Sequence, residues 1–187
     1  MSTFEKSMPE PRMSKAQRAL IGAMLTLLSK NSFQKITVND LCETALVSRS
    51  AFYVYFEDKY HLLKFCMEEL KRQILERADP TGPMDLIKII VDYIYENSNI
   101  FKNLMLKETN LELTELLRQL MVRDMEKILT KQAAGGNNFT LPISIVAIFS
   151  SGGIASLLMW WIGGGFPVSK EEMADYLTKL TVLNNKG

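Results

Sequence analysis

The longest uncharged stretch of the sequence sets the tightest limit on how this chain can fold. Residues 141–162, LPISIVAIFSSGGIASLLMWWI, are 22 consecutive positions without Asp, Glu, Lys, Arg or His. A helix this apolar is not stable when it is fully exposed to water, and its length alone would suffice to cross a lipid bilayer. We therefore expect it to be covered by the rest of the chain, by a second protein molecule or by lipid.

The composition of this stretch favours a water-soluble protein. It contains four serine hydroxyls and the Gly152-Gly153 pair, and no cluster of Lys or Arg adjoins it, as one does beside many membrane helices. We expect a buried helix at a subunit interface and no membrane, with a membrane-associated helical protein through residues 141–162 as the alternative. Four small side chains would let another helix approach closely: Ser151, Gly152, Ala155 and Ser156.

Apolar residues elsewhere recur at the three- and four-residue spacing of amphipathic helices, and no strand pattern is present. Capping pairs, Ser14 with Gln17 and Ser169 with Glu172, mark two helix starts, and Asp58 can cap another. The expected fold is all-α, a three-helix N-terminal domain followed by a C-terminal bundle of about six helices that dimerises. The apolar stripes occupy residues 20–28, 38–45, 52–56, 62–74, 86–94, 113–129 and 173–180.

Residues 37–59, TVNDLCETALVSRSAFYVYFEDK, predict two short helices joined by a tight turn. Thr37 is an N-cap type of residue with Asp40 three positions later, which is close to a capping box. Ser48 is a second N-cap candidate, and Phe52 with Phe56 gives the following helix a buried side. Two short helices with this connection form the helix-turn-helix unit, whose second helix enters the DNA major groove.

The charge distribution agrees with this interpretation, although the asymmetry is small. The formal net charge of the chain is +1, so the protein is not a polycation. Residues 1–64 carry nine Lys/Arg against six Asp/Glu, a net +3, and the remainder carries 13 against 15, a net −2. Electrostatic attraction for phosphate is therefore expected at the N-terminal third of the chain.

Other functional classes find little support in the residues. Cys42 and Cys66 stand at apolar positions without Cys or His partners, so we predict free thiols and no metal site. No GxSxG, HExxH or P-loop motif is present. We predict no enzymatic activity and no cofactor, with an enzyme that lacks a recognisable motif as an alternative. Residues 1–13 contain no apolar leader, and we expect a flexible arm there and a cytoplasmic protein.

Two segments resemble a known family. Residues 14–63, with ITVNDL at 36–41 and VSRSAFYVYFEDK at 47–59, resemble the TetR/AcrR family of bacterial transcriptional regulators. Residues 149–173 are similar to the C-terminal domain of one branch of that family, which includes regulators resembling the dihydroxyacetone kinase operon activator. The matching positions in this second segment are Gly152-Gly153-Ile154, Trp161, Phe166 and Glu171-Glu172-Met173.

The resemblance implies which residues contact DNA. Arg49 is the expected base reader, because a guanidinium can bind guanine O6 and N7 together. Two positions depart from the family: Leu46 stands where a turn glycine is common, and Ala51 where many members have Thr. The implied phosphate contacts are Thr37, Tyr53, Tyr55 and Lys59, and the implied contacts at or near base edges are Asn39, Ser48, Arg49 and Ser50.

The resemblance also implies a domain plan and partners. Residues 14–57 would form the helix-turn-helix DNA-binding domain, and residues 58–187 the ligand-binding and dimerisation domain. The expected function is that of a dimeric, ligand-responsive repressor that reads a palindromic operator in double-stranded DNA. Its homodimer interface is expected to include Ser151, Gly152, Ala155, Ser156, Met173, Leu177 and Leu180. A small hydrophobic effector is expected to contact Tyr93, Tyr95, Phe101, Met105, Met121 and Met125.

Overall fold

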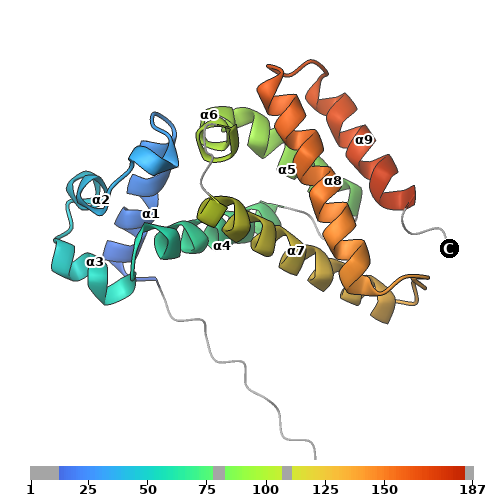
Figure 1. The fold of residues 1–187 in the computed structure, drawn as a ribbon, viewed down its shortest axis with the longest axis horizontal. Coiled ribbons are helices and arrows are strands. Elements are labelled where there is room, and N and C mark those ends of the chain that lie inside the picture. Colours follow the sequence, from blue (N-terminus) through green and yellow to red (C-terminus); the bar gives the residue numbers. More distant parts are fainter. Residues whose placement is uncertain (1–12, 78–82, 107–110, 184–187) are drawn as a thin grey trace, which may run out of the picture.

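The computed structural model describes residues 13–77, 83–106 and 111–183, and all regular structure in these ranges is helical. This confirms the predicted all-α fold (Figure 1). The arm expected at residues 1–13 lies outside the described residues except for Met13. The elements are α1 (Lys15–Leu28), the 3₁₀ turn η1 (Phe33–Lys35), α2 (Val38–Ala45), α3 (Arg49–Tyr55), α4 (Lys59–Arg77), α5 (Pro83–Glu96), α6 (Ser98–Phe101), the π-helical turn η2 (Lys102–Leu106), α7 (Leu111–Ala134), α8 (Ile143–Gly163) and α9 (Lys170–Leu183).

The predicted helix starts are confirmed by side-chain caps. The main-chain N–H of Gln17 donates to Ser14 Oγ at 3.1 Å, and the N–H of Ser14 donates to Gln17 Oε1 at 2.9 Å. Ser169 and Glu172 make the same reciprocal pair before α9, at 2.9 and 3.1 Å. Such caps satisfy N–H groups that have no partner inside the helix, which explains why short sequence signals locate these ends well.

The N-terminal helices share one core, in which Leu20, Met24, Phe52 and Leu62 are fully buried. Helices as short as α2 and α3 need such a core, because a helix of two turns is not stable alone. The same core also takes in Leu104 of η2 and two further residues near it, Ile100 and Leu113. It therefore extends beyond residue 57, the predicted end of the DNA-binding domain, and that boundary remains a prediction.

A second core lies between α5, α8 and α9, where Val91, Trp161 and Met173 are buried. Trp161 Nε1 donates to the carbonyl of Val168 at 2.8 Å, which fixes the turn between α8 and α9. Nearer the start of α8, Ala147 packs with residues of α7, and α7 and α8 cross in Figure 1. Helix α8 is thus held on one side by three neighbouring helices.

The other side of α8 is exposed and apolar. Ile145, Phe149 and Trp160 are 52%, 72% and 51% exposed, and they recur at the spacing of one helix face. Within the described residues α8 is the one helix long and apolar enough to cross a membrane, and 28% of its apolar window is buried. The expectation of a buried helix is therefore correct within this chain for one face only.

Candidate functional site

Helix α2 begins at a capped N-terminus. The N–H and hydroxyl of Thr37 both donate to Asp40 Oδ2, at 2.8 and 2.7 Å, and the N–H of Asp40 donates back to Thr37 Oγ1 at 3.1 Å. The hydrogen bond from the Thr37 side chain holds the pKa of the Asp40 carboxyl below its ordinary value. Because the first N–H groups of a helix attract anions, this end of α2 is suited to a phosphate.

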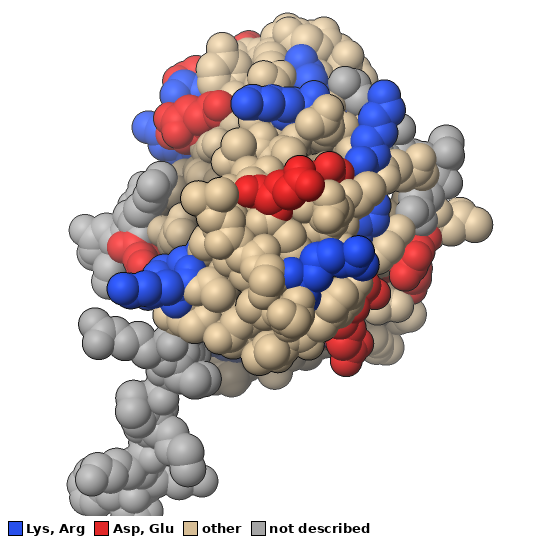
Figure 2. All heavy atoms as spheres, turned by 90° about the vertical axis from the view of Figure 1, so that its left-hand side faces the viewer, with Lys and Arg blue, Asp and Glu red and all other residues tan. Residues whose placement is uncertain are grey.

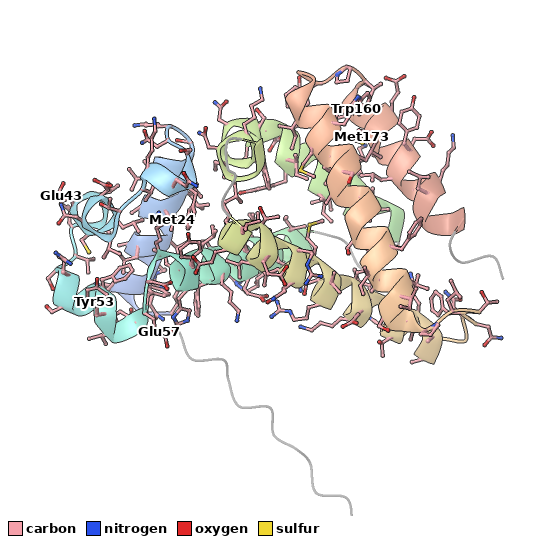
Figure 3. The ribbon with its side chains drawn as sticks, viewed as in Figure 1. Met24, Glu43, Tyr53, Glu57, Trp160 and Met173 are labelled. Atoms are coloured by element: carbon pink, nitrogen blue, oxygen red, sulfur yellow. The ribbon has the colours of Figure 1, made fainter. Side chains whose placement is uncertain are left out.

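Helix α3 turns a polar face outwards. Ser48 caps it by accepting from the N–H of Ala51 at 3.2 Å, and the hydroxyls of Ser48 and Ser50 lie 3.0 Å apart. Arg49 and Ser50 are exposed, and Tyr53, one turn later on the same face, is 52% exposed. Figure 3 shows Tyr53 at the outer end of the molecule. These side chains have the position and the chemistry of a DNA-reading face.

The turn between α2 and α3 contains a strained leucine. Leu46 has φ 55° and ψ 42°, in the left-handed region that glycine adopts more easily. The N–H of Val47 donates to Cys42 O at 3.0 Å, which closes the end of α2 in the manner of a Schellman motif. The side chain of Leu46 is 92% exposed, so the leucine gains little from packing.

Besides Thr37, Ser48 and Ser50, three more of the predicted DNA contacts have intramolecular partners. Asn39 Nδ2 donates to Glu43 Oε1 at 2.6 Å. Tyr55 is half-buried and packs on the N-terminal core. Lys59 Nζ donates to three main-chain carbonyls, those of Phe33, Gln34 and Ile36. Their contacts with DNA remain predictions, and each would have to form beside or in place of a bond within the chain.

The end of the molecule that carries α2 and α3 has mixed charge. In Figure 2, which looks at this end, basic and acidic side chains are interspersed among uncharged residues. Glu43 on α2 and Glu57 after α3 lie at the same end as Tyr53 (Figure 3). The small positive excess of the N-terminal third therefore does not form a continuous basic surface on this face, and recognition would depend on individual contacts.

A cavity of about 370 Å³ lies between α7, α8 and η2. Four residues predicted for the dimer interface, Ser151, Gly152, Ala155 and Ser156, line this cavity, and their small size leaves space beside α7. The other lining residues include Leu104, Leu113, Thr114, Leu117, Arg118, Met121, Val122, Ile148 and Met159.

Of the residues predicted to bind an effector, Met121 lines this cavity. Tyr95 packs instead on Phe166, with ring centroids 4.8 Å apart, and Phe101 packs on the second core and on Tyr93. Met125 packs with the third cluster, around Leu129. The side chain of Met105 lies outside the described residues.

The remaining predicted interface residues divide into two groups. Met173 and Leu177 are 0% and 5% exposed and belong to the core between α5, α8 and α9, so contact with a second subunit would require that core to open. Leu180 is 51% exposed, and Gly152 and Ser156 are also exposed. In Figure 3, Trp160 lies on α8 at the opposite end of the molecule from Tyr53.

Family models cover both parts of the chain. Residues 20–65 match the model described as bacterial regulatory proteins, tetR family, and residues 83–182 match the model described as transcriptional regulator C-terminal region. The chain belongs to the TetR family. This membership confirms the resemblance, and TetR-family regulators carry the helix-turn-helix found here in α2 and α3.

Relatives of this TetR-family regulator include the HTH-type dhaKLM operon transcriptional activator DhaS of Lactococcus lactis subsp. lactis (strain IL1403), which is 26% identical over 113 residues. That alignment covers 60% of this chain and 59% of the relative. The solved structure of the dihydroxyacetone kinase operon activator DhaS has a TM-score of 0.63 at 19% identity, covering 91% of this chain and 96% of that one. A TetR regulator from Streptococcus agalactiae 2603V has a TM-score of 0.65 at 23% identity, covering 89% and 93%. These structures share the fold.

The sequence of this TetR-family chain did not predict the cavity residues Leu104, Leu113 and Arg118. Leu104 belongs to a π-helical turn, and Leu113 also contributes to the N-terminal core. Their position depends on the packing of segments far apart in the chain, which periodicity does not report. Among the described residues, no group of three or more His, Cys, Asp or Glu side chains could hold a metal ion.

Proposed function

We propose that the protein is a homodimeric, effector-responsive DNA-binding regulator that reads a palindromic operator in the cytoplasm. The observation that carries the proposal is the exposed polar face of α3, with Arg49, Ser50 and Tyr53 presented at one end of the molecule behind a capped N-terminus. Arg49 would read a guanine, and Thr37 with the first N–H groups of α2 would hold a phosphate.

The dimer would form through the outer face of α8, with α9 beside it. One helix-turn-helix reads few base pairs, so specific binding needs two readers about one helical turn apart, ~34–36 Å. The face that contains Ile145, Phe149 and Trp160 exposes large apolar side chains near both ends of the helix, as protein contacts commonly do. We propose Gly152, Gly153, Ser156 and Leu180 as further members of this interface, because they are exposed on the same helices.

The same exposed face supports the membrane alternative, and one experiment separates the two. A helix that crosses a bilayer requires lipid or protein around its whole surface, whereas a dimer requires one covered face. Purification without detergent followed by sedimentation would give a dimer of one size if a second subunit covers α8. Recovery only from the membrane fraction would overturn the dimer.

The cavity is the proposed effector site. Its volume lies within the usual range for small-molecule sites, roughly 300–1,000 Å³. The wall is largely apolar, and Arg118 is its cation, with Glu115 Oε1 2.6 Å from the guanidinium. This combination suits a small hydrophobic molecule with an anionic end, which would compete with Glu115 for the guanidinium.

The cavity is connected to the DNA-binding end through η2. Leu104 lines the cavity, and the side chain next to it, Asn103, is 4% exposed and donates to the carbonyl of Leu28 at 2.7 Å. Leu28 is the last residue of α1, which packs on α2 and α3. Effector binding would change the free energy of DNA binding by no more than the difference in effector-binding free energy between the DNA-bound and the DNA-free protein.

Decanoate, compared with decanol, tests the effector site. We expect decanoate to raise the thermal unfolding temperature more than decanol does, and Arg118→Gln to remove that difference while Ala155→Leu reduces binding of both. Equal effects of both probes on the wild type would contradict an anionic effector. A stabilisation unchanged by Ala155→Leu would contradict this cavity as the site.

Selection from random duplex DNA tests the proposed function most broadly. We expect an enriched, roughly palindromic sequence whose half-sites are spaced by about one helical turn or a multiple of it. The repressor prediction requires a separate assay, since the relative from Lactococcus lactis is by its name an activator. If the protein is a repressor, adding it should lower transcription from a promoter that carries the selected operator at its start site. No enrichment at low salt would overturn DNA recognition.

A further inference from the structure

Lys59 makes a set of contacts that its sequence position does not explain. It is the first residue of α4, where a cation is unfavourable because the helix dipole is positive at that end. Its Nζ donates to the carbonyls of Phe33, Gln34 and Ile36 at 3.0, 3.1 and 2.9 Å. It also lies 4.7 Å from the ring centroid of Phe33. Three carbonyl oxygens thus match the three N–H donors of an ammonium group.

These carbonyls belong to the segment that leads into α2. Residues 33–35 form the η1 turn, and Ile36 directly precedes Thr37, the N-cap of α2. The carbonyl of Phe33 also accepts from the N–H of Ile36 at 3.2 Å, and a charged donor adds a stronger hydrogen bond to such carbonyls than a neutral one would. The segment is therefore fixed to the start of α4 by a residue 23 to 26 positions further along the chain.

We propose that Lys59 is a positioning residue for DNA binding: it holds residues 33–36 so that Thr37 and the first N–H groups of α2 meet a phosphate, and it does not itself neutralise one. This inference rests on the proposed DNA binding and replaces the phosphate contact expected from the sequence. The donor geometry supports it, because a phosphate contact would require the ammonium to give up carbonyls that lie within the fold.

The dependence of affinity on salt distinguishes the two roles. Each phosphate neutralised by a lysine contributes about 0.9 to the slope of log K against log salt. Thr37 and main-chain N–H groups are neutral and add nothing to that slope. We expect Lys59→Met to weaken binding to the selected operator about tenfold with the slope unchanged. Lys64→Met, which removes an exposed charge from the same helix, is the matched control.

Two further variants complete the test. Lys59→Arg keeps the charge, but its planar fork cannot reproduce three donors around one atom, so we expect only partial recovery of affinity. Thr37→Val combined with Lys59→Met should weaken binding by less than the product of the single effects, because both changes disturb the same contact.

Three outcomes would overturn the positioning role of Lys59. They are a salt slope reduced by about one unit in Lys59→Met, full recovery of operator affinity in Lys59→Arg, and affinity losses that multiply in the double variant. If Lys59→Met does not fold, the Lys59→Arg comparison still decides between the roles. Absence of any selected operator would instead count against the proposed function and not against Lys59.

Discussion

The outer faces of α3 and α8 are both exposed, yet their chemistry is opposite. The α3 face presents Arg49, Ser50 and Tyr53, whereas the α8 face presents Ile145 and Phe149 along an uncharged helix. Polar groups that point into water are well hydrated without a partner, whereas the hydration of an exposed apolar face is unfavourable and a partner relieves it. In the proposed function the first face binds DNA and the second face binds a second copy of the chain.

The largest expected effect comes from a charge placed on the α8 face. Gly153→Arg should weaken self-association at least about a hundredfold, because the interface would have to bury an unpaired cation. A Cβ atom added at Gly153 meets nothing within 4 Å, and the position is exposed, so we expect the subunit itself to fold normally. Gly152→Arg should act in the same way, but Gly152 also lines the cavity and gives a less specific result. Sedimentation velocity across a range of concentrations measures the change.

Gly22→Arg is the matched control for that substitution. Gly22 is an exposed glycine in α1, and a Cβ atom added there also meets nothing within 4 Å. We expect this variant to associate like the wild type. A Gly153→Arg protein that sediments as a wild-type dimer would remove α8 from the interface.

A smaller effect is expected on the α3 face. Arg49→Ala should weaken binding to the selected operator roughly ten- to a hundredfold, corresponding to a base contact of ~1–3 kcal/mol. Binding to unrelated duplex should change only a few-fold, since one exposed charge is lost. Titrations of both duplexes at one salt concentration give the ratio, and Arg18→Ala on α1 is the control. Equal losses on both duplexes would show that Arg49 does not read a base.

The turn between α2 and α3 gives a prediction about stability. Leu46→Gly should raise the free energy of unfolding by about 1 kcal/mol, because glycine adopts a positive φ without strain and the leucine side chain is almost wholly exposed. Thr44→Gly, an exposed helical position in α2, should instead lower it by a few tenths of a kcal/mol. Urea unfolding measures both, and a loss of stability in Leu46→Gly would show that the strain argument is wrong.

The smallest effect concerns the cap of α2 and depends on pH. The folded-state pKa of Asp40 is lowered, so its stabilising contribution is complete above the unfolded-state pKa, near 3.8, and is lost as pH falls through the folded value. The stability advantage of the wild type over Asp40→Asn, below about 1 kcal/mol, should therefore shrink between neutral pH and about pH 3. Chemical denaturation at the two pH values tests this, and a constant difference would exclude the ionised cap.

The sequence predicted the α3 end better than the α8 end because local rules govern it. Ser14, Thr37 and Ser48 cap helices through residues three positions away, and such signals are readable without tertiary structure. The strained φ of Leu46 was also foreseeable, since a glycine is common in that turn. The contacts of Lys59 were not foreseeable, because its carbonyl partners lie more than 20 residues away in the sequence.

The surroundings of the small residues of α8 could not be predicted from the sequence. Ser151, Gly152, Ala155 and Ser156 permit close helix contact, but their spacing does not distinguish a closely packed helix from a cavity beside them. In this fold they face α7 across a cavity. Met173 and Leu177 belong to an apolar stripe of α9 that was predicted correctly, yet these two residues pack inside the subunit. Only tertiary packing distinguishes the inner face of such a helix from its outer one.

Hydroxyl-radical footprinting of the selected operator tests most directly whether the two faces have these two partners. We expect two protected patches on one side of the duplex, separated by about one helical turn or a multiple of it, and their joint loss when Gly153→Arg replaces the wild type at the same concentration. A single protected patch that Gly153→Arg leaves unchanged would contradict the assignment of α3 to DNA and of α8 to a second subunit.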